Sequence, residues 1–276
     1  MGYYTHLGLA KEPFSLSPDP AFFFRSAAHT QTLQRLEILI RLRRGLGLVF
    51  GDVGTGKTTL VRVLVQSLQS EPAIDFYLIL NPLFQSDFQF LEYLCKTFGV
   101  STPVRSTMDC LEALQNHLFH RGVDDGRTTV LIIDEGQNLT PSLIELPRSL
   151  LNFETNESKL LQLIILSQLE ALPRFQRIRN FMDRVALKYV VNPFNEEETR
   201  RMIQHRLGKA GGAAGGPRFT EDAVRRIHLA TQGYPRRINR VCQKALERAA
   251  VAGTRLIDAE TVGEALEPDE TESEAS

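Results

Sequence analysis

The chain of 276 residues is almost electrically neutral, with 32 lysines and arginines against 33 aspartates and glutamates. Hydrophobic residues make up 42% of it and charged residues 24%, an ordinary globular balance for one large domain or two modest ones. This balance excludes a strongly basic nucleic-acid coat and a polyacidic disordered chain, although it allows a local basic patch.

Cysteine usage and hydropathy indicate the compartment. Three scattered cysteines without a CxxC pair predict neither a disulfide framework nor a zinc site. The first residues lack the basic start and apolar run of a signal peptide, and the longest apolar stretches are strand-sized, below the ~18 residues of a membrane span. We expect a cytoplasmic protein without a direct membrane span, which reaches the inner membrane only through partners.

Short apolar runs alternate with helical patterns through the first two thirds of the chain. Residues 12–26, rich in proline and phenylalanine, predict an ordered loop, and helical periodicity follows over 30–44. The predicted strands are 46–50, 74–80, 128–133, 160–166 and 185–191. The predicted helices between them are 57–69, 87–98, 108–121, 141–153 and 169–182. This alternation is typical of a parallel sheet covered on both faces, an α/β fold.

After Pro193 the pattern becomes helical, without a strand signal. The predicted helices are 196–208, 220–232, 235–252 and 258–266, with Thr220 and Asp258 as N-caps of the second and fourth. Residues 209–217, KAGGAAGGP, predict a flexible connection. We therefore expect an α/β domain over 1–193, which includes an N-terminal loop at 1–29, then a small all-α lid domain over 194–266 and an acidic, disordered tail over 267–276.

A phosphate-binding motif carries the strongest functional signal. The segment GDVGTGKT matches GxxxxGK[ST] in full and lies between a predicted strand and an amphipathic helix, the context that the motif requires. Its glycines let backbone N–H groups point at phosphate oxygens, Lys57 is suited to reach the β- and γ-phosphates, and the Thr58 hydroxyl to bind Mg²⁺. The predicted nucleotide-binding residues are Gly51, Asp52, Val53, Gly54, Thr55, Gly56, Lys57, Thr58 and Thr59. A glycine turn that merely joins a strand to a helix is the simpler alternative.

An acidic pair supplies the partner that such a site needs for Mg²⁺. The apolar run at 130–133 delivers Asp134 and Glu135 to the carboxyl end of a buried strand, where open α/β sheets bind ligands. Asp134 is expected to hold the Mg²⁺ shell, and Glu135 to orient or deprotonate the attacking water. Ordinary turn and capping duties are the alternative for the pair alone. Together with the phosphate motif, the pair predicts a nucleoside triphosphatase.

The phosphate loop, the Asp-Glu strand end and the helical C-terminal segment together resemble the AAA+ superfamily. More narrowly, the chain resembles the ATPases of general secretion pathway protein A and their type IV pilus relatives. The matching segments are LGLAKEPFSLSPDPAFFFRSAAH (7–29), GDVGTGKTTL (51–60), LIIDEGQNL (131–139), SLLNFET (149–155), LSQLEAL (166–172), NPFNEEETRRMIQHRL (192–207) and GYPRRINRVCQKAL (233–246). The family usually has alanine where Gly136 stands, and Gly-Gln-Pro where residues 167–169 read Ser-Gln-Leu. The resemblance implies a five-stranded α/β/α domain with a helical lid, and ATP with Mg²⁺ as cofactors.

The resemblance also implies further site residues. Gln168 matches the polar sensor beside the γ-phosphate, with Ser167 as the neighbouring candidate. Arg184 occupies the place of the arginine finger that acts on the neighbouring subunit, which implies a homo-oligomeric ring or arc. The other candidates for the finger are Arg174, Arg177 and Arg179. Arg236, in GYPRR at a predicted helix start, matches the second sensor arginine, with Arg237 as the alternative. A solvated surface is the simpler interpretation for any of these arginines.

Two classes of function remain open. The first is an ATPase that couples hydrolysis to the assembly or remodelling of a secretion or type IV pilus-like system, with a protein of that system as partner. The second is an ATP-switched DNA-binding regulator of the transposition-protein type. Basic clusters at 41–44, 225–226 and 236–240 could contact DNA phosphates, and such binding would fall steeply with salt. A nucleotide-dependent scaffold with very slow turnover differs from the first mainly in degree.

Overall fold

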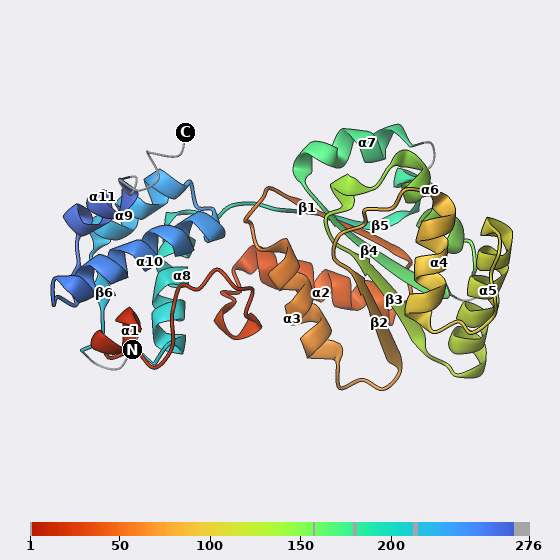
Figure 1. Cartoon of the computed structure of the whole chain (residues 1–276), viewed down its shortest axis with the longest axis horizontal. Helices are drawn as coiled ribbons and strands as arrows, with labels where there is room; N and C mark the ends of the chain where they lie inside the picture. Colours follow the sequence, from red (N-terminus) through yellow and green to blue (C-terminus); the bar gives the residue numbers. More distant parts are fainter. Residues whose placement is uncertain (1, 157, 179–180, 212–214, 268–276) are drawn as a thin grey trace. The chain divides into compact units, whose positions relative to one another are not determined.

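The computed structural model describes residues 2–156, 158–178, 181–211 and 215–267 (Figure 1). The chain divides into two compact units, each described by itself below. The sheet unit comprises Ala28–Val53 and Leu60–Val191. The helical unit comprises Met1–Ala27, Gly54–Thr59 and Asn192–Ser276. The predicted tail and the middle of the glycine-rich connection, residues 268–276 and 212–214, lie outside the described residues.

The five predicted strands form one parallel sheet in the order β2-β3-β4-β1-β5, which confirms the expected fold class. The strands are β1 (Leu46–Gly51), β2 (Ile74–Ile79), β3 (Thr128–Ile133), β4 (Leu161–Ser167) and β5 (Val185–Val191). Every residue of β1, β3 and β4 is buried, which explains why these segments read as continuous apolar runs instead of alternating ones.

Helices cover both faces of this sheet (Figure 1). One face carries α2 (Ala27–Arg41) and α3 (Lys57–Leu68), and the other carries α4 (Asp87–Phe98), α5 (Thr107–Phe119) and α6 (Pro141–Leu150). Alternate strand residues such as Leu131, Ile133 and Leu163 share one apolar core with α4, α5 and α6. Helix α2 packs closely against the sheet, because a Cβ on Gly47 of β1 would lie 3.1 Å from Leu39 of α2.

The prediction of one continuous helix over 169–182 is wrong. The chain instead forms a 3-10 turn η4 (Leu169–Ala171), a short helix α7 (Leu172–Arg177) and a second 3-10 turn η5 (Met182–Arg184). Proline is best tolerated in the first turn of a helix, and Pro173 lies in the first turn of α7. At its other end Ile178 adopts an extended conformation that stops the helix.

Among the described residues of its C-terminal part, the helical unit contains four helices, as the periodicity predicts. They are α8 (Glu196–Lys209), α9 (Glu221–Thr231), α10 (Pro235–Val251) and α11 (Ala259–Leu266). Thr220 and Asp258 accept the expected capping bonds from Ala223 N and Thr261 N. The expectation of an all-α segment needs a correction, because β6 (Arg218–Phe219) and β7 (Leu256–Ile257) pair in parallel. Strands of two residues have no periodicity that a sequence pattern can reveal.

The N-terminal segment is an ordered loop apart from α1 (Tyr3–His6) and the 3-10 turn η1 (Pro20–Phe22). A buried arginine of α8 explains this order. The Arg206 guanidinium donates to the carbonyl oxygens of Pro13 (2.7 Å), Ser15 (3.1 Å) and Phe22 (3.4 Å), and it lies over the Phe22 ring. Burial lowers the pKa of Arg206 to about 10. The three prolines of this loop prevent regular secondary structure, and the guanidinium instead provides hydrogen bonds for its backbone carbonyls.

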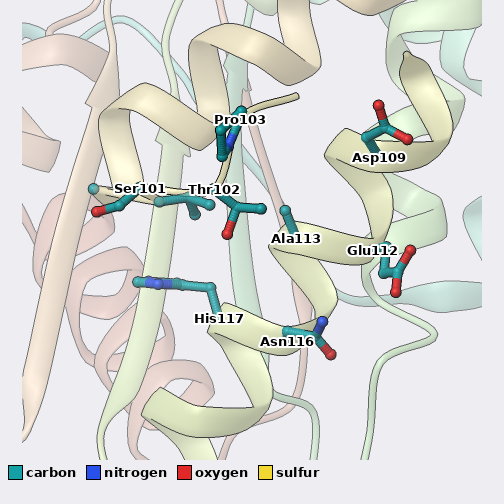
Figure 2. Close-up of a pocket in the computed structure, with 10 residues that line it drawn as sticks. Ser101, Thr102, Pro103, Asp109, Glu112, Ala113, Asn116 and His117 are labelled. Atoms are coloured by element: carbon teal, nitrogen blue, oxygen red, sulfur yellow. The ribbon is translucent and has the colours of Figure 1, made fainter. Parts of the chain in front are cut away.

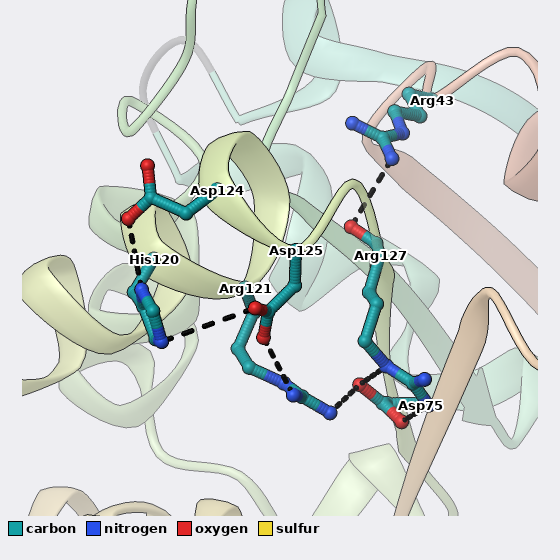
Figure 3. A network of polar contacts seen from close by, with 7 residues as sticks. All are labelled: Arg43, Asp75, His120, Arg121, Asp124, Asp125 and Arg127. Atoms are coloured by element: carbon teal, nitrogen blue, oxygen red, sulfur yellow. Dashed lines mark hydrogen bonds and ion pairs between the residues drawn. The ribbon is translucent and has the colours of Figure 1, made fainter.

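Charged side chains form a network where β2 and β3 begin, which we name the amino edge of the sheet unit (Figure 3). The Asp75 carboxylate accepts hydrogen bonds from Arg121 (2.6 Å) and from Arg127 (Nε, 2.8 Å), and Arg121 also pairs with Asp125 (2.7 Å). Arg43 donates to the carbonyl oxygens of Gly126 (2.9 Å) and Arg127 (3.1 Å). These contacts join the loop before β3 to β2 and to the turn that follows α2.

Among the described residues, we find no helix that combines the length and the apolar character needed to cross a membrane.

Candidate functional site at the carboxyl ends of the strands

Three adjacent strands end at one edge of the sheet unit, which we name the carboxyl edge. In the order β3-β4-β1, Asp134 directly follows β3, Ser167 ends β4 and Gly51 ends β1. Because the strands are parallel, their carboxyl ends meet at the same edge. The tertiary structure therefore brings together segments that lie more than a hundred residues apart in the sequence.

The phosphate motif forms the turn between β1 and α3, and Lys57 is the first residue of that helix. Gly54 and Gly56 have positive φ values of 82° and 95°, a conformation that glycine adopts without the Cβ strain of other residues. Thr55 and Lys57 are buried, and Val53 is 58% exposed. A glycine-lined turn that leads into a helix N-terminus is the backbone form that cradles phosphate.

Within the helical unit, Arg236 contacts the phosphate loop through its backbone. Its amide donates to the Gly54 carbonyl at 3.2 Å, and a Cβ on Gly54 would lie 2.9 Å from the Arg236 Cβ. Arg237, the alternative, lies over the Tyr234 ring at 4.7 Å. In the same unit the N-terminal loop also lies near the phosphate loop, since a Cβ on Gly56 would be 3.8 Å from the Phe23 ring.

The acidic pair lies at a sharp bend after β3. Asp134 is buried, and its Oδ1 accepts the Glu135 N–H at 2.9 Å. Glu135 has a φ of 53°, which is uncommon for a residue other than glycine, and a 3-10 turn η3 (Gly136–Asn138) follows it. A Cβ on Gly136 would lie 2.5 Å from Ile165 Cγ2 and 3.0 Å from the Leu166 carbonyl. This approach to β4 leaves no room for a side chain at position 136.

The end of β4 supplies the two polar sensor candidates. The Ser167 hydroxyl is buried and makes no hydrogen bond with any of the residues described. Gln168 is half-buried, and its backbone N–H donates to Gln137 Oε1 at 3.2 Å. The structure places Gln168 one residue beyond β4 and next to the loop that carries Glu135.

The candidates for the arginine finger differ in what they contact. Arg184, on the exposed turn η5 before β5, donates to the Asn152 side chain. Arg174 instead donates to the carbonyls of Gln137 (2.7 Å) and Leu139 (3.2 Å), a contact within its own unit. Arg177 is exposed, and Arg179 lies outside the described residues. Arg174 therefore has a local role in holding the loop after β3, which the sequence pattern did not suggest.

Gln137 is the residue of this edge that the sequence analysis missed. Its side-chain amide donates to Glu135 Oε2, while its Oε1 accepts from Gln168. A polar residue two positions after the acidic pair was the available signal, but DEGQN by itself does not show where the glutamine points.

A surface cavity of about 470 Å³ lies elsewhere on the sheet unit, between residues 99–103 and α5 (Figure 2). Its Asp109 carboxylate accepts the backbone N–H groups of Arg105 and Ser106, and the first of these bonds lowers its pKa. Burial lowers the pKa of His117. Asp109 caps α5, and the lining comes from this loop and helix, so the cavity is separate from the strand ends.

The phosphate loop and the carboxyl edge, each taken by itself, carry groups of the kind that a magnesium-bound nucleoside triphosphate requires. The glycine turn offers backbone donors, and Gly54 leaves no room for a side chain. Thr58 and Asp134 provide a hydroxyl and a carboxylate, oxygen ligands of the kind that Mg²⁺ binds. The buried Ser167 hydroxyl is a polar atom available to a ligand or to water.

Comparisons with known proteins agree with this geometry. A family model described as an AAA domain matches residues 40–175. Three solved structures have the same fold: Aeropyrum pernix ORC2 in ADPNP–ADP complexes, Cdc6p of Pyrobaculum aerophilum, and the Thermotoga maritima RuvB Holliday junction branch migration motor. Their TM-scores are 0.66, 0.69 and 0.58, and their identities are 15%, 19% and 15%. The alignments cover 96%, 96% and 89% of this chain, and 74%, 73% and 72% of theirs. Residues 40–175 therefore form an AAA domain, and the chain shares the fold of AAA+ proteins with a P-loop nucleotide-binding domain.

Within that class, the chain resembles general secretion pathway protein A. It is 33% identical to that protein of Aeromonas hydrophila over 258 residues. The matched region is 92% of this chain and 46% of the relative, so the chain spans about half the length of the curated protein that it matches.

Proposed function

We propose that this chain binds ATP with Mg²⁺ and hydrolyses it. The observation that carries the proposal is the intact phosphate motif after β1 together with Asp134 and Glu135 after β3, two strands that end at the same edge. The match of residues 40–175 to an AAA domain and the ADPNP–ADP complexes of the ORC2 structure support the choice of nucleotide.

Each residue has a distinct role in this proposal. The backbone of the phosphate loop and Lys57 bind the phosphates, and Thr58 and Asp134 hold the magnesium ion. The ion, when bound with the nucleotide, neutralises charge on the phosphate oxygens. Glu135 orients the attacking water and accepts its proton. Gln168 is the polar sensor beside the γ-phosphate and this water. Arg236 contacts the bound phosphates and so couples the nucleotide to α10, since its backbone N–H bonds to the Gly54 carbonyl of the phosphate loop.

The test is a Glu135→Gln variant, which keeps the size of the side chain and removes its basicity. We expect nucleotide binding to persist while ATP turnover falls about 10²–10⁴-fold, the usual contribution of a positioned base. Glu170→Gln, an exposed glutamate three residues beyond β4, is the matched control and should keep full turnover. Wild-type turnover in Glu135→Gln would falsify the proposed role of this residue and the hydrolysis mechanism with it.

The oligomeric part of the proposal rests on Arg184. An arginine that acts on the neighbouring subunit's nucleotide must be exposed, and Arg184 is. Arg174 is exposed as well, but it bonds to two backbone carbonyls of the loop after β3, whereas Arg184 bonds to the side chain of Asn152. Arg184→Ala and Glu135→Gln should each be inactive alone. Mixed, they should regain part of the wild-type turnover, because one subunit supplies the base and the other the arginine. No regain from the mixture would remove Arg184 from this role.

We propose that hydrolysis drives assembly or remodelling of a secretion or type IV pilus-like system. The supporting observation is the 33% identity to general secretion pathway protein A over 92% of this chain. Turnover per protomer that rises with protein concentration and does not respond to duplex DNA is the expected result. Stimulation by DNA would instead favour the alternative function.

The alternative, an ATP-switched DNA-binding regulator, can be tested on α10. Of the basic clusters, Arg41 pairs with Glu37 and Glu71, and Arg226 donates to the Ala259 carbonyl. Arg237 and Arg240 are exposed on α10. If the alternative is correct, duplex binding should weaken steeply between ~50 and ~200 mM salt, and an Arg237→Ala, Arg240→Ala double variant should reduce the slope. Undetectable binding at ~50 mM salt would exclude it.

A further inference from the structure

Three bonds hold Gln137 at the point where the ends of β3 and β4 meet. Its side-chain Nε2 donates to Glu135 Oε2, its Oε1 accepts the Gln168 N–H at 3.2 Å, and its backbone carbonyl accepts Arg174 Nη1 at 2.7 Å. All four residues belong to the sheet unit. One side chain thus bridges the catalytic-base candidate on one strand and the residue after the neighbouring strand.

The loop around this bridge has little freedom to move. Arg174 also donates to the Leu139 carbonyl at 3.2 Å, so one guanidinium holds both ends of a three-residue segment. On the opposite side, Gly136 approaches β4 so closely that a Cβ would lie 2.5 Å from Ile165 Cγ2. A loop fixed in this way can hold a side chain at a defined position before any ligand binds.

Glu135 depends on such support more than a residue in regular structure does. Its φ of 53° makes it one of the three residues other than glycine, among those described, with a positive φ, and it lies between a strand and a 3-10 turn. The backbone therefore does not anchor the side chain as a helix or strand would. The carboxylate needs a hydrogen bond of its own to stay in one orientation.

We propose that Gln137 is a positioning residue for hydrolysis: it holds the Glu135 carboxylate in its working orientation and links it to Gln168, so that the base and the sensor move together. The inference rests on the proposed ATPase function. The Gln137 side-chain amide donates to Glu135 Oε2, so Oε1 is the oxygen that binds the attacking water. The Gln137–Gln168 bond ties that orientation to the end of β4.

The test uses two Gln137 variants that differ in what they retain. Gln137→Ala removes both side-chain bonds. Gln137→Glu keeps an acceptor for the Gln168 N–H but loses the donor and sets a carboxylate against Glu135. We expect both to lower kcat about 10- to 100-fold, the usual cost of misplacing a reacting group by about 1 Å, with the Kd for ATP unchanged. Asn138→Ala, one residue on and bonded to Asn81 at 2.9 Å, is the matched control and should keep its kcat.

A double variant separates this role from a structural one. If Gln137 acts through Glu135, then adding Gln137→Ala to Glu135→Gln should cause no further loss of the residual turnover, because groups that act as a unit are not additive. A wild-type or raised kcat in Gln137→Ala, a near-wild-type kcat in Gln137→Glu, or an additive loss in the double variant would each overturn the proposal. Turnover retained in Glu135→Gln alone would instead contradict the proposed function, so the two failures are distinguishable.

Discussion

The acidic side chains at the two edges of the sheet unit have different hydrogen-bond partners. At the amino edge, Asp75 is held by two arginines, and Arg121 joins it to Asp125 (Figure 3). At the carboxyl edge, Glu135 is held by the amide of Gln137. A carboxylate paired with guanidinium groups contributes to stability, whereas one that is held by a neutral amide keeps its charge available for chemistry. The comparison implies that substitutions at the first edge affect folding and those at the second affect turnover.

The largest expected effect is at the carboxyl edge. Asp134→Asn should lower ATP turnover by about 10²–10³-fold, since it removes the charge of the side chain that we propose as a Mg²⁺ ligand and with it several kcal/mol of transition-state stabilisation. An asparagine oxygen can still accept the Glu135 N–H, so the bond at 2.9 Å can remain. The thermal unfolding midpoint should change by less than about 2 °C. A large drop in this midpoint would show that Asp134 is structural and would break the comparison.

The amino edge should show the opposite pattern. Asp75→Ala leaves Arg121 and Arg127 without the carboxylate that they share, and the Asp75 side chain is only 15% exposed. We expect a loss of about 2–3 kcal/mol in the free energy of unfolding, measured by urea titration, with turnover unchanged at a temperature where the variant is folded. Asp124→Ala, a 60% exposed carboxylate of the same network, should cost much less. Equal losses from the two would contradict the importance of the shared carboxylate.

The pH dependence of stability provides a second test of the role of Asp75. Hydrogen bonds from Arg127 and then Arg121 lower the pKa of Asp75 despite its partial burial. A carboxylate with a lowered folded-state pKa contributes stability that is complete above its unfolded pKa of about 3.9 and is lost as the pH falls through the folded value. The difference in unfolding free energy between the wild type and Asp75→Asn should therefore be constant from about pH 7 to pH 5 and shrink below about pH 4. A constant difference down to about pH 2 would contradict this assignment.

The smallest effect is expected at His120, on the exposed rim of the same network. A hydrogen bond to Asp124, followed by the charge of Asp125, raises the pKa of His120. A histidine with a raised folded-state pKa stabilises the fold below its unfolded pKa of about 6.5, and this contribution is lost as the pH rises through the folded value. His120→Ala should thus lower the urea midpoint slightly near pH 5.5 and leave it unchanged near pH 8.5. A larger effect at the higher pH would reverse the sign that we expect.

Sequence patterns were most informative where a single segment carries the whole signal. The buried strands appear as apolar runs, and the phosphate motif, the acidic pair, Thr220 and Asp258 each depend on residues that are neighbours in the chain. They were least informative where structure arises between segments. The pair β6–β7, the break around α7 and the Arg206 contacts with the N-terminal loop all join distant residues or depend on the surroundings.

The same division separates what the sequence by itself determined from what only the tertiary structure decided. The fold class, the phosphate loop and the acidic strand end follow from local periodicity and motif chemistry, because hydrophobic spacing and glycine conformations are properties of short segments. The bonds from Gln137 to Glu135 and Gln168, the local role of Arg174 and the arginine-bound carboxylate at the amino edge came only with the structure. Their cause is the packing of parallel strands side by side, which brings residues from β2, β3 and β4 together at the two edges of one sheet.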